Sequence, residues 1–289
     1  MTSLAAAFAE ELPGVSPDVY DARDFRAIAE LVNAEAGIVL PPGKAMLVYS
    51  RIAPRVRNTG CGTFAAYIDL VRRDPEERYR AVAALTTNHT FFHRESHHFE
   101  HFASEVRPAM VRALDAGQPA RLWSAGCSSG EETWSLVMTL LGEDRTRGAQ
   151  IANRNVRVLA SDLADHALAK ASAGLYSAAD LKAVPEPLRR NWTIAAPGGV
   201  SMTEEARRIV RFRMLNLLKD WPFKGRFDVI FCRNVMIYFD QSTKERLVER
   251  FAAQLAPGGH LYIGHSERAS GPAAAMLEPV GPTIYRRRA

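Results

Sequence analysis

Hydrophobic and polar positions follow a helical spacing near the start of the chain. The apolar residues that share one helical face are Phe25, Ile28, Leu31 and Val32. Asp21 lies just before them, and its carboxylate suits the N-cap position of a helix. Three further helices are predicted from Lys44 to Asn58, over "TFAAYIDLVRR" and over "PEERYRAVAALTTN". Residues 21–87 are therefore expected to form a small all-helical domain, after a flexible tail over residues 1–20.

After Asn88 the pattern changes to short apolar runs that end in small or polar residues. These predicted strands are "ARLWSAG", "NVRVLASD", "FDVIFCRN" and "GGHLYIGH". Predicted helices alternate with them, over Glu131–Gly142, Asp165–Ala173 and Ser242–Ala256. The alternation predicts an α/β fold over residues 88–289, with a doubly wound, mostly parallel sheet that gathers ligands at the carboxyl ends of its strands. "NWTIAAPGGVSM" and "RRIVRF" break the alternation and are assigned to a small antiparallel insertion over about 188–213.

Composition narrows the class of protein. The chain has 289 residues, 47% of them hydrophobic, and a net charge of +5, which permits an acidic partner but is equally typical of an ordinary soluble surface. No window is long and apolar enough to span a membrane. The three cysteines are scattered and no basic segment precedes the short N-terminal apolar run, so a cytoplasmic protein with reduced thiols is expected.

The segment "WSAGCSSGEETWSL" (residues 123–136) predicts a strand, a turn of small residues and a helix. Such turns often bind phosphate, but Glu131 and Glu132 here occupy the positive end of the helix, where a phosphate would meet like charge. A cationic ligand without phosphate fits better, and S-adenosylmethionine (SAM) is such a ligand. The alternative is a helix start whose acidic residues only complement the helix dipole.

Two more strand ends add candidate site residues. Asp162 ends "VRVLASD", where dinucleotide-binding folds place an acid that accepts hydrogen bonds from ribose hydroxyls, although it could only cap the next helix. In "FDVIFCRNVMIYFD", Asn234 and Tyr238 are four residues apart and are expected on one helical face. His89, His93, His97 and His101 recur every fourth residue, but without a cysteine or an HExxH motif they indicate a ring-rich helix face, and no metal is expected.

These segments together resemble the chemotaxis-receptor methyltransferases, the CheR family. The resemblance rests on "TTNHTFFHRESHHF", "WSAGCSSGEETWSL", "LASD", "LNLL", "FDVIFCRNVMIYFD" and "GHSE", in the family's order. It implies transfer of the SAM methyl group to glutamate side chains of chemoreceptor cytoplasmic helices, with methyl esters and S-adenosylhomocysteine as products. Family members often have Thr at position 129 and Pro-Tyr at 133–134, where this chain has Ser129, Thr133 and Trp134.

The resemblance also implies roles for individual residues. The implied cofactor contacts are Asn88, Thr90, Arg94, Glu132, Asp162, Asn216, Leu217, Arg233 and Asn234. Arg94 and Tyr238 match the positions nearest the transferred methyl group and are the candidate catalytic residues. An SN2 transfer to an ionised glutamate needs alignment rather than acid–base help, so the absence of a recognisable triad is expected.

Substrate docking is a separate prediction. Arg51, Arg55 and Arg57 are expected to form a basic helix face that binds the glutamate-rich receptor, although an ordinary solvated face is the alternative. The inserted segment is short for a loop that grips a C-terminal receptor pentapeptide, so no such tether is expected. Two other functions stay open. The first is methylation of another substrate such as RNA, but the sequence has no aromatic-rich basic strand, and no nucleic-acid binding is expected. The second is a non-catalytic SAM-binding sensor or scaffold.

Overall fold

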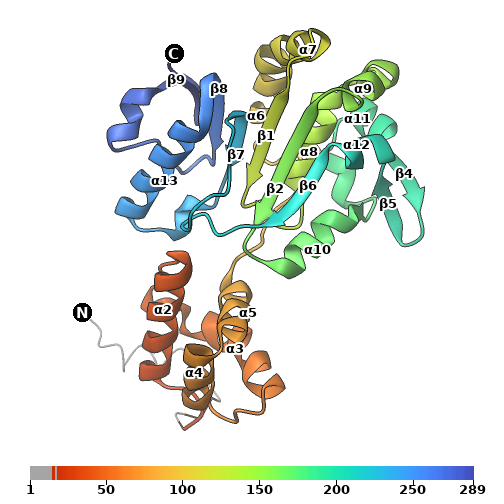
Figure 1. Cartoon of the computed structure of the whole chain (residues 1–289). Helices are drawn as coiled ribbons and strands as arrows, with labels where there is room; N and C mark the ends of the chain where they lie inside the picture. Colours follow the sequence, from red (N-terminus) through yellow and green to blue (C-terminus); the bar gives the residue numbers. More distant parts are fainter. Residues whose placement is uncertain (1–14, 17) are drawn as a thin grey trace. The chain divides into compact units, whose positions relative to one another are not determined.

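The fold is described from a computed structural model, which defines residues 15, 16 and 18–289 (Figure 1). Two compact units divide this part of the chain. The first holds the described residues up to Thr87 together with Tyr238–Thr243, and the second holds Asn88–Ile237 and Lys244–Ala289. In the described part of the chain, no helix is both long and apolar enough to cross a membrane.

Helices make up the first unit. Its segments are α2 (Ala22–Ala36), η1 (Pro42–Lys44), α3 (Ala45–Asn58), α4 (Phe64–Arg73) and α5 (Pro75–Leu85). Asp21 caps α2 as predicted, since its side chain accepts hydrogen bonds from the backbone of Arg23 and Asp24. Most of the predicted tail lies outside the described residues, but Tyr20 is buried, with its ring centroid 4.3 Å from that of Phe64.

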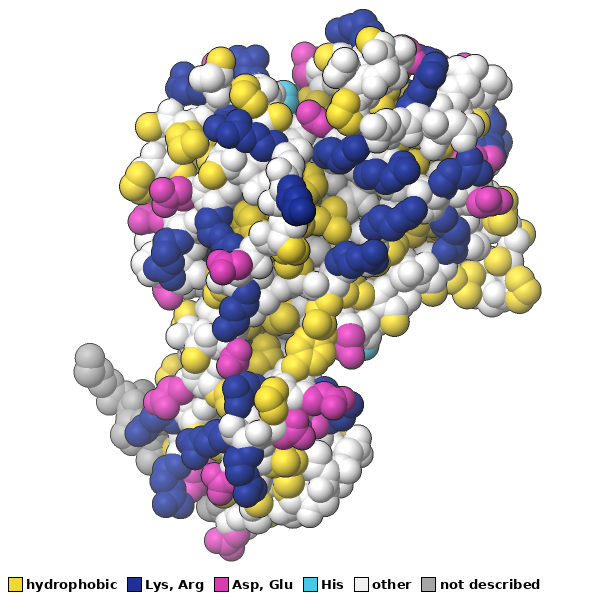
Figure 2. Space-filling view, viewed as in Figure 1, with side chains coloured by type: hydrophobic (Ala, Val, Ile, Leu, Met, Phe, Trp, Pro, Cys, Tyr) yellow, Lys and Arg dark blue, Asp and Glu magenta, His cyan; other side chains and the backbone are white. Residues whose placement is uncertain are grey.

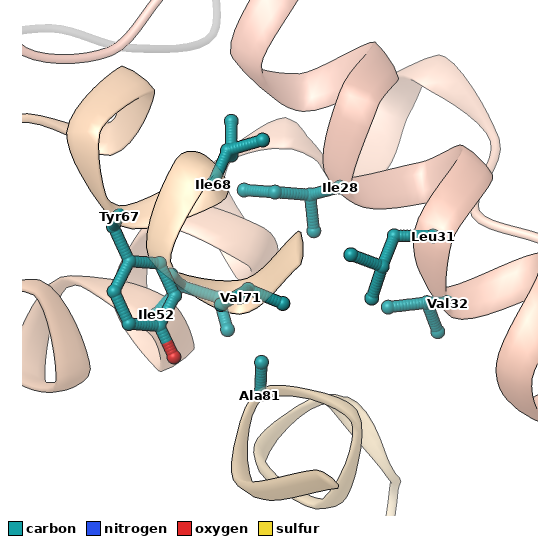
Figure 3. Close-up of a pocket in the computed structure, with 8 residues that line it drawn as sticks. All are labelled: Ile28, Leu31, Val32, Ile52, Tyr67, Ile68, Val71 and Ala81. Atoms are coloured by element: carbon teal, nitrogen blue, oxygen red, sulfur yellow. The ribbon is translucent and has the colours of Figure 1, made fainter. Parts of the chain in front are cut away.

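The apolar faces of these helices meet in one core. Figure 3 shows a cavity in this core, of about 10 Å³, between α2, α3, α4 and α5. Its lining residues are Ile28, Leu31, Val32, Ile52, Tyr67, Ile68, Val71 and Ala81. A cavity of this size is at the lower limit for one water molecule, so it is a packing gap and no ligand site.

The second unit is built on a seven-stranded sheet, ordered β6-β2-β1-β7-β8-β10-β9 among the described residues. The strands are β1 (Ala120–Ala125), β2 (Val156–Asp162), β6 (Val210–Met214), β7 (Phe227–Cys232), β8 (Leu255–Ile263), β9 (Leu277–Gly281) and β10 (Ile284–Arg287). The first five are parallel, and β10 runs antiparallel between β8 and β9. The predicted fold class, an all-helical domain followed by a doubly wound α/β domain with a small antiparallel sheet, is confirmed.

Helical segments connect these strands. They are α6 (His97–His101), η2 (Phe102–Val106), α7 (Arg107–Asp115), α8 (Glu131–Leu141), α9 (Arg145–Ala152), α10 (Asp165–Ala173), η3 (Asp180–Ala183), α11 (Glu186–Trp192), α12 (Glu204–Arg208), η4 (Met236–Tyr238), α13 (Gln241–Gln254) and η5 (Pro272–Met276). Every residue of α8 is buried, because this helix packs on the sheet and is covered in turn by α9, α11 and α12. The helix therefore fixes the turn that precedes it within the core of this unit.

The boundaries of the antiparallel insertion differ from the prediction. The small sheet consists of β3 (Leu175–Tyr176), β4 (Thr193–Ala196) and β5 (Gly199–Met202), in the order β3-β5-β4. The prediction was wrong for "RRIVRF", because Val210–Met214 is strand β6 of the main sheet and pairs in parallel with β2. Val210 is buried and Phe212 packs on Trp134 of α8, so this strand completes the core beside β2.

Candidate functional site

The turn between β1 and α8 is held by hydrogen bonds to the end of β2. The backbone N–H groups of Gly126 and Cys127 both donate to the Ser161 carbonyl, at 2.8 and 2.9 Å. The backbone N–H of Ser128 donates to Asp162 Oδ2 at 2.7 Å. These three donors are thus used within the protein, and a phosphate could not take them as it does in a phosphate-binding loop.

Glycine is required twice in this turn for packing. Gly126 has a φ of +80°, and a Cβ there would lie 2.3 Å from Val235 Cγ2. Gly130 has a φ of +97°, and its Cβ would lie 2.8 Å from Ala171 Cβ. Both residues adopt the left-handed region that disfavours side chains, and both let neighbouring segments of the protein approach the turn closely.

Both glutamates of the turn are buried at the first turn of α8. Glu132 accepts a hydrogen bond from Ser124 Oγ at 2.8 Å and lies 3.6 Å from an Arg233 guanidinium nitrogen. Burial raises the pKa of Glu132, although the charge of Arg233 opposes the shift. The Glu131 carboxylate accepts a hydrogen bond from Ser129 Oγ at 2.8 Å and forms an ion pair with Lys170 Nζ at 3.4 Å. Of the two, Glu132 is therefore the carboxylate that faces the end of β7.

Asp162 closes the other side of the turn. It is 9% exposed, and burial raises its pKa while the backbone N–H groups of Ala164 and Ser128 oppose the shift. Its Oδ1 accepts from Ala164 at 2.9 Å and its Oδ2 from Ser128. The backbone of Leu163 also hydrogen-bonds to this carboxylate, and since a carboxylate has about four acceptor positions, about one remains for a hydroxyl group such as that of a ribose.

A partly buried ionic network that the sequence did not reveal centres on Glu95. Its Oε1 lies 2.9 Å from His265 Nδ1 and 3.3 Å from Asn234 Nδ2, and its Oε2 lies 3.6 Å from Arg233. Burial alone would raise the pKa of Glu95, but the hydrogen bond from His265 and the charge of Arg233 outweigh it and lower the pKa to about 2. Glu95 is consequently ionised at neutral pH and connects two predicted cofactor residues.

Arg233 joins this network to the turn. The guanidinium lies between Glu95 and Glu132, and its carbon is 5.3 Å from the centre of the Phe99 ring. It also donates to the backbone carbonyl of Arg94. The Arg94 side chain donates to the His89 carbonyl at 3.0 Å. The loop that carries the catalytic candidate Arg94 is therefore held through its backbone and its side chain.

Glu267, from the "GHSE" segment, holds the loop after β7. It accepts hydrogen bonds from the backbone N–H groups of Gly264 at 2.6 Å and Asn234 at 3.2 Å. Asn234 has a φ of +59°, and the only helical turn that follows it in this loop is η4 (Met236–Tyr238). The prediction that Asn234 and Tyr238 share one helical face is wrong, because left-handed backbone at Asn234 interrupts any helix. Within the first unit, the Tyr238 carbonyl accepts from Val39 N–H at 2.8 Å.

The other predicted cofactor residues, Asn88, Thr90, Asn216 and Leu217, lie in loops of the second unit. Asn88 Nδ2 lies 3.2 Å from His166 Nε2 in α10, the helix that follows Asp162. Asn216 and Leu217 follow β6, whose last residue is paired with Asp162. Thr90 is half-buried in the loop before Arg94. β1, β2, β6 and β7 are neighbours in the sheet, so their carboxyl ends bring Glu132, Asp162, Asn216, Leu217, Arg233 and Asn234 to one edge.

The histidine repeat does not form one helix face. Helix α6 begins only at His97, and His93 has a φ of +53°, so the prediction of a continuous face was wrong. His101 Nδ1 lies 2.9 Å from the Tyr262 hydroxyl, and burial lowers the pKa of His93 to about 4. Across the described residues, no three His, Cys, Asp or Glu side chains are grouped so that they could hold a metal ion.

Two of the predicted docking arginines have partners within the helical unit. Arg51 donates to the carbonyls of Leu85 at 3.1 Å and Thr86 at 2.7 Å, at the end of α5. Arg55 forms a bidentate pair with the buried carboxylate of Glu77, with one bond of 2.9 Å. Arg57 is exposed. Docking by this helix stays a prediction, and Arg57 is the member whose charge is most accessible.

The second unit thus presents buried carboxylates and incompletely paired polar atoms at one sheet edge. The buried side-chain atoms of this part of the unit without a hydrogen-bond partner among the described residues include Glu95 Oε2, Ser128 Oγ, Thr133 Oγ1, Arg233 Nε and Glu267 Oε1. Buried polar atoms of this kind ordinarily have partners, so the edge fits a polar ligand. The raised pKa values of Glu132 and Asp162 favour one that brings positive charge or hydroxyl donors.

A doubly wound sheet with a small-residue turn and a strand-end carboxylate defines a nucleoside-binding α/β domain. Comparison with protein families identifies which one. The model described as "CheR methyltransferase, SAM binding domain" matches residues 88–284, and the "CheR methyltransferase, all-alpha domain" matches residues 23–86. The chain belongs to the CheR methyltransferase family, and its cofactor is SAM.

Relatives of similar length support this assignment. A probable chemotaxis protein methyltransferase of Rhizobium etli is 40% identical over 89% of this chain and 96% of its own length. Chemotaxis protein methyltransferase 2 of Pseudomonas aeruginosa is 40% identical over 92% of this chain and 93% of its own. The chemotaxis protein methyltransferase of Escherichia coli is 40% identical over 85% of this chain and 84% of its own.

Proposed function

We propose that this protein transfers the methyl group of SAM to glutamate side chains of chemoreceptor cytoplasmic helices, as an enzyme of chemotactic adaptation that works in the cytoplasm. The observation that carries the proposal is the buried carboxylate edge of a domain that matches the family's SAM-binding domain. When bound, SAM supplies a methyl group activated by a positively charged sulfur. A receptor glutamate oxygen would accept this methyl group as the carbon–sulfur bond breaks, and the electron pair of that bond would stay on sulfur.

The chain's own residues have binding and orienting roles in this proposal. Asp162 accepts a hydrogen bond from a ribose hydroxyl with its remaining acceptor capacity. Glu132 and the Asn234 side chain hold the polar tail of the cofactor, and Arg233 fixes Glu132 in place across 3.6 Å. Arg94 and Tyr238 orient the incoming carboxylate, whose ordinary pKa of about 4.3 leaves it ionised at neutral pH. Alignment alone can supply several kcal/mol in such a reaction.

We infer further that receptor binding needs no C-terminal pentapeptide tether. β4 and β5 pair from Thr193↔Met202 to Ala196↔Gly199, so only Pro197 and Gly198 connect the two strands. A two-residue turn leaves no extended loop to grip a peptide. A receptor fragment without its last five residues is expected to be methylated as well as the full fragment.

The first test uses methyl-labelled SAM with a receptor cytoplasmic fragment, and scores label released as methanol by mild base. Base-labile label on the receptor supports carboxylate methylation, whereas base-stable label or none, with SAM bound, contradicts it. Asp162→Ala is the companion variant: we expect at least tenfold weaker SAM binding, about 1.4 kcal/mol or more, with an unchanged circular dichroism spectrum. SAM binding without transfer to any receptor would favour the sensor or scaffold alternative.

A further inference from the structure

One face of the main sheet is open to solvent at β2 and β6. Along β2, Arg157 is exposed between the buried Val156 and Val158, and along β6, Arg211 and Arg213 are exposed after the buried Val210. Parallel strands in doubly wound sheets are usually buried on both faces and have nearly continuous apolar sequences. Exposed arginines alternate with apolar residues in β2 and β6, which indicates that one face of the sheet is not covered at these two strands.

The cause lies in the connection from β6 to β7. Residues 215–226 form no helix, although this crossover passes over the face in question. Trp221 and Phe223 from the connection pack on Trp123 of β1, with ring centroids 4.8 and 4.9 Å apart from it, and Phe251 of α13 joins them at 5.4 Å. The aromatic cover thus protects β1, and β2 and β6 lie beyond it.

Four arginines occupy this uncovered face, and we call them the basic sheet face: Arg121, Arg157, Arg211 and Arg213. Arg121 is directly opposite Arg157 in the strand pairing, while Arg211 is opposite Leu159 and Arg213 opposite Ser161. Figure 2 shows Lys and Arg side chains gathered over β1, β2 and β6.

The guanidinium groups of Arg157, Arg211 and Arg213 have no salt-bridge partner among the described residues, whereas Arg121 donates to Asn155 and its charge acts on the neighbouring Asp228 carboxylate. The hydrogen bonds of these three side chains go to backbone carbonyls of their own strands and, for Arg211, also to that of Arg208 at the end of α12. Positive charges that are close together on a surface repel one another, and a bound anionic partner relieves this repulsion. The surface is therefore complementary to an extended acidic partner.

We propose that the basic sheet face binds a glutamate-rich helix of the receptor's cytoplasmic domain, an inference that rests on the proposed function. Arg211 and Arg213 project from one strand about 7 Å apart, since each strand residue advances about 3.3 Å. Carboxylates at i and i+4 on a helix are separated by about 6 Å along its axis. The planar guanidinium fork is also well matched to a carboxylate.

The position of the face connects docking to the site. Arg213 is paired with Ser161, the residue before Asp162, so the basic sheet face extends to the carboxyl edge of β2 and β6. A helix laid along these strands would bring its own side chains to that edge. Between the arginines lies the half-buried Leu159, which offers an aliphatic contact, whereas Ser161 is buried and its Oγ accepts from Trp123 Nε1 at 2.8 Å, so the exposed groups of this face are aliphatic and cationic and not stacking rings. An acidic protein helix therefore suits the face better than single-stranded nucleic acid.

The test compares Arg157→Glu/Arg211→Glu with Lys182→Glu/Arg190→Glu, a control of equal charge change on exposed helical residues of the same unit. Binding of a labelled receptor cytoplasmic fragment is measured by fluorescence anisotropy at about 50 mM and about 500 mM salt. We expect roughly tenfold weaker binding for the first variant at low salt, a smaller difference at high salt, and wild-type binding for the control. SAM affinity is expected to stay unchanged in both variants.

Equal receptor binding by the wild type and the Arg157/Arg211 variant would overturn the inference. Loss of binding to a single-stranded RNA oligomer, with receptor binding retained, would overturn it in favour of nucleic acid. Methyl transfer is measured separately: wild-type protein that binds the receptor through this face but transfers no methyl group would refute the proposed function and leave the docking inference standing. If the Glu variant does not fold, Arg157→Gln/Arg211→Gln replaces it, with an expected loss of about threefold.

Discussion

Replacing Glu95 with glutamine removes one negative charge from the partly buried network while keeping the shape of the side chain. The carboxylate is hydrogen-bonded to His265 and Asn234 and lies 3.6 Å from Arg233. Glutamine would present an amide to a guanidinium and a histidine, and it would leave Arg233 with Glu132 as its nearest acidic partner. We expect Glu95→Gln to lower both the stability of the second unit and its affinity for SAM.

The pKa of Glu95 sets the size of the effect on stability. Its fall from 4.5 to about 2 corresponds to at most about 3.4 kcal/mol, at 1.36 kcal/mol per unit. Because His265 is 67% exposed, solvent screens part of the network, and we expect about 1.5 to 2 kcal/mol. A depressed carboxyl pKa stabilises the fold fully above pH 4.5, and this contribution is lost as the pH falls from 4.5 toward 2.

Tryptophan fluorescence during urea unfolding measures the stability of the second unit, which contains Glu95. All 4 tryptophans of the chain, Trp123, Trp134, Trp192 and Trp221, lie in the second unit. The difference between wild type and Glu95→Gln is expected to be largest at pH 7 and smaller at about pH 3.5. Glu143→Gln, which changes an exposed carboxylate of the same unit, is expected to match wild type. A difference that is equal at both pH values would mean that the charge of Glu95 is not its source, and no difference would refute a stabilising network.

Three further variants test other parts of the structure. Gly126→Ala is expected to destabilise the second unit by at least about 2 kcal/mol in the same urea assay, and Val235→Ala is expected to recover part of this loss by removing the 2.3 Å contact but not the backbone strain. Arg94→Ala is expected to lower receptor methylation at least about 100-fold, and near-normal turnover would exclude its catalytic role. Arg55→Ala is expected to cost about 2 to 3 kcal/mol, because the buried Glu77 carboxylate loses its bidentate partner and keeps only the Tyr67 hydroxyl at 2.6 Å and Arg80 at 3.8 Å. Arg57→Ala is expected to stay within about 0.5 kcal/mol, and equal losses by circular dichroism would contradict this.

Local patterns predicted the elements whose neighbours are close in sequence. The cap at Asp21 and the strand-end position of Asp162 depend on a few adjacent residues, and both are confirmed by the structure. Strand β6 was misassigned because its alternation of Val210 and Phe212 with arginines suits an antiparallel insertion equally well. Only its pairing with β2, about 50 residues earlier, places it in the main sheet, and long-range pairing of this kind has no local signal.

The site shows the same limit at the level of side chains. The Glu95 network joins three segments that are far apart in the chain, around residues 95, 233 and 265. Each segment alone contains only common polar residues, and no sequence motif predicts that the three segments lie in contact. The left-handed backbone of Glu95 and Asn234, with φ of +56° and +59°, was likewise invisible in the sequence and made a helical reading of the second loop wrong.

Charge is distributed within the second unit so that two ligands of opposite sign meet different surfaces. Glu132 and Asp162 are buried at the carboxyl edge, where a SAM sulfonium and ammonium would be attracted and a phosphate repelled. Arg157, Arg211 and Arg213 of the basic sheet face are exposed, and the face reaches the same edge through Arg213, where it attracts carboxylates and repels cations. The net charge of +5 does not reveal this division, because it sums the charges of a buried acidic site and of an exposed basic surface. The separation explains how one small domain can hold a cationic methyl donor and still attract an anionic methyl acceptor.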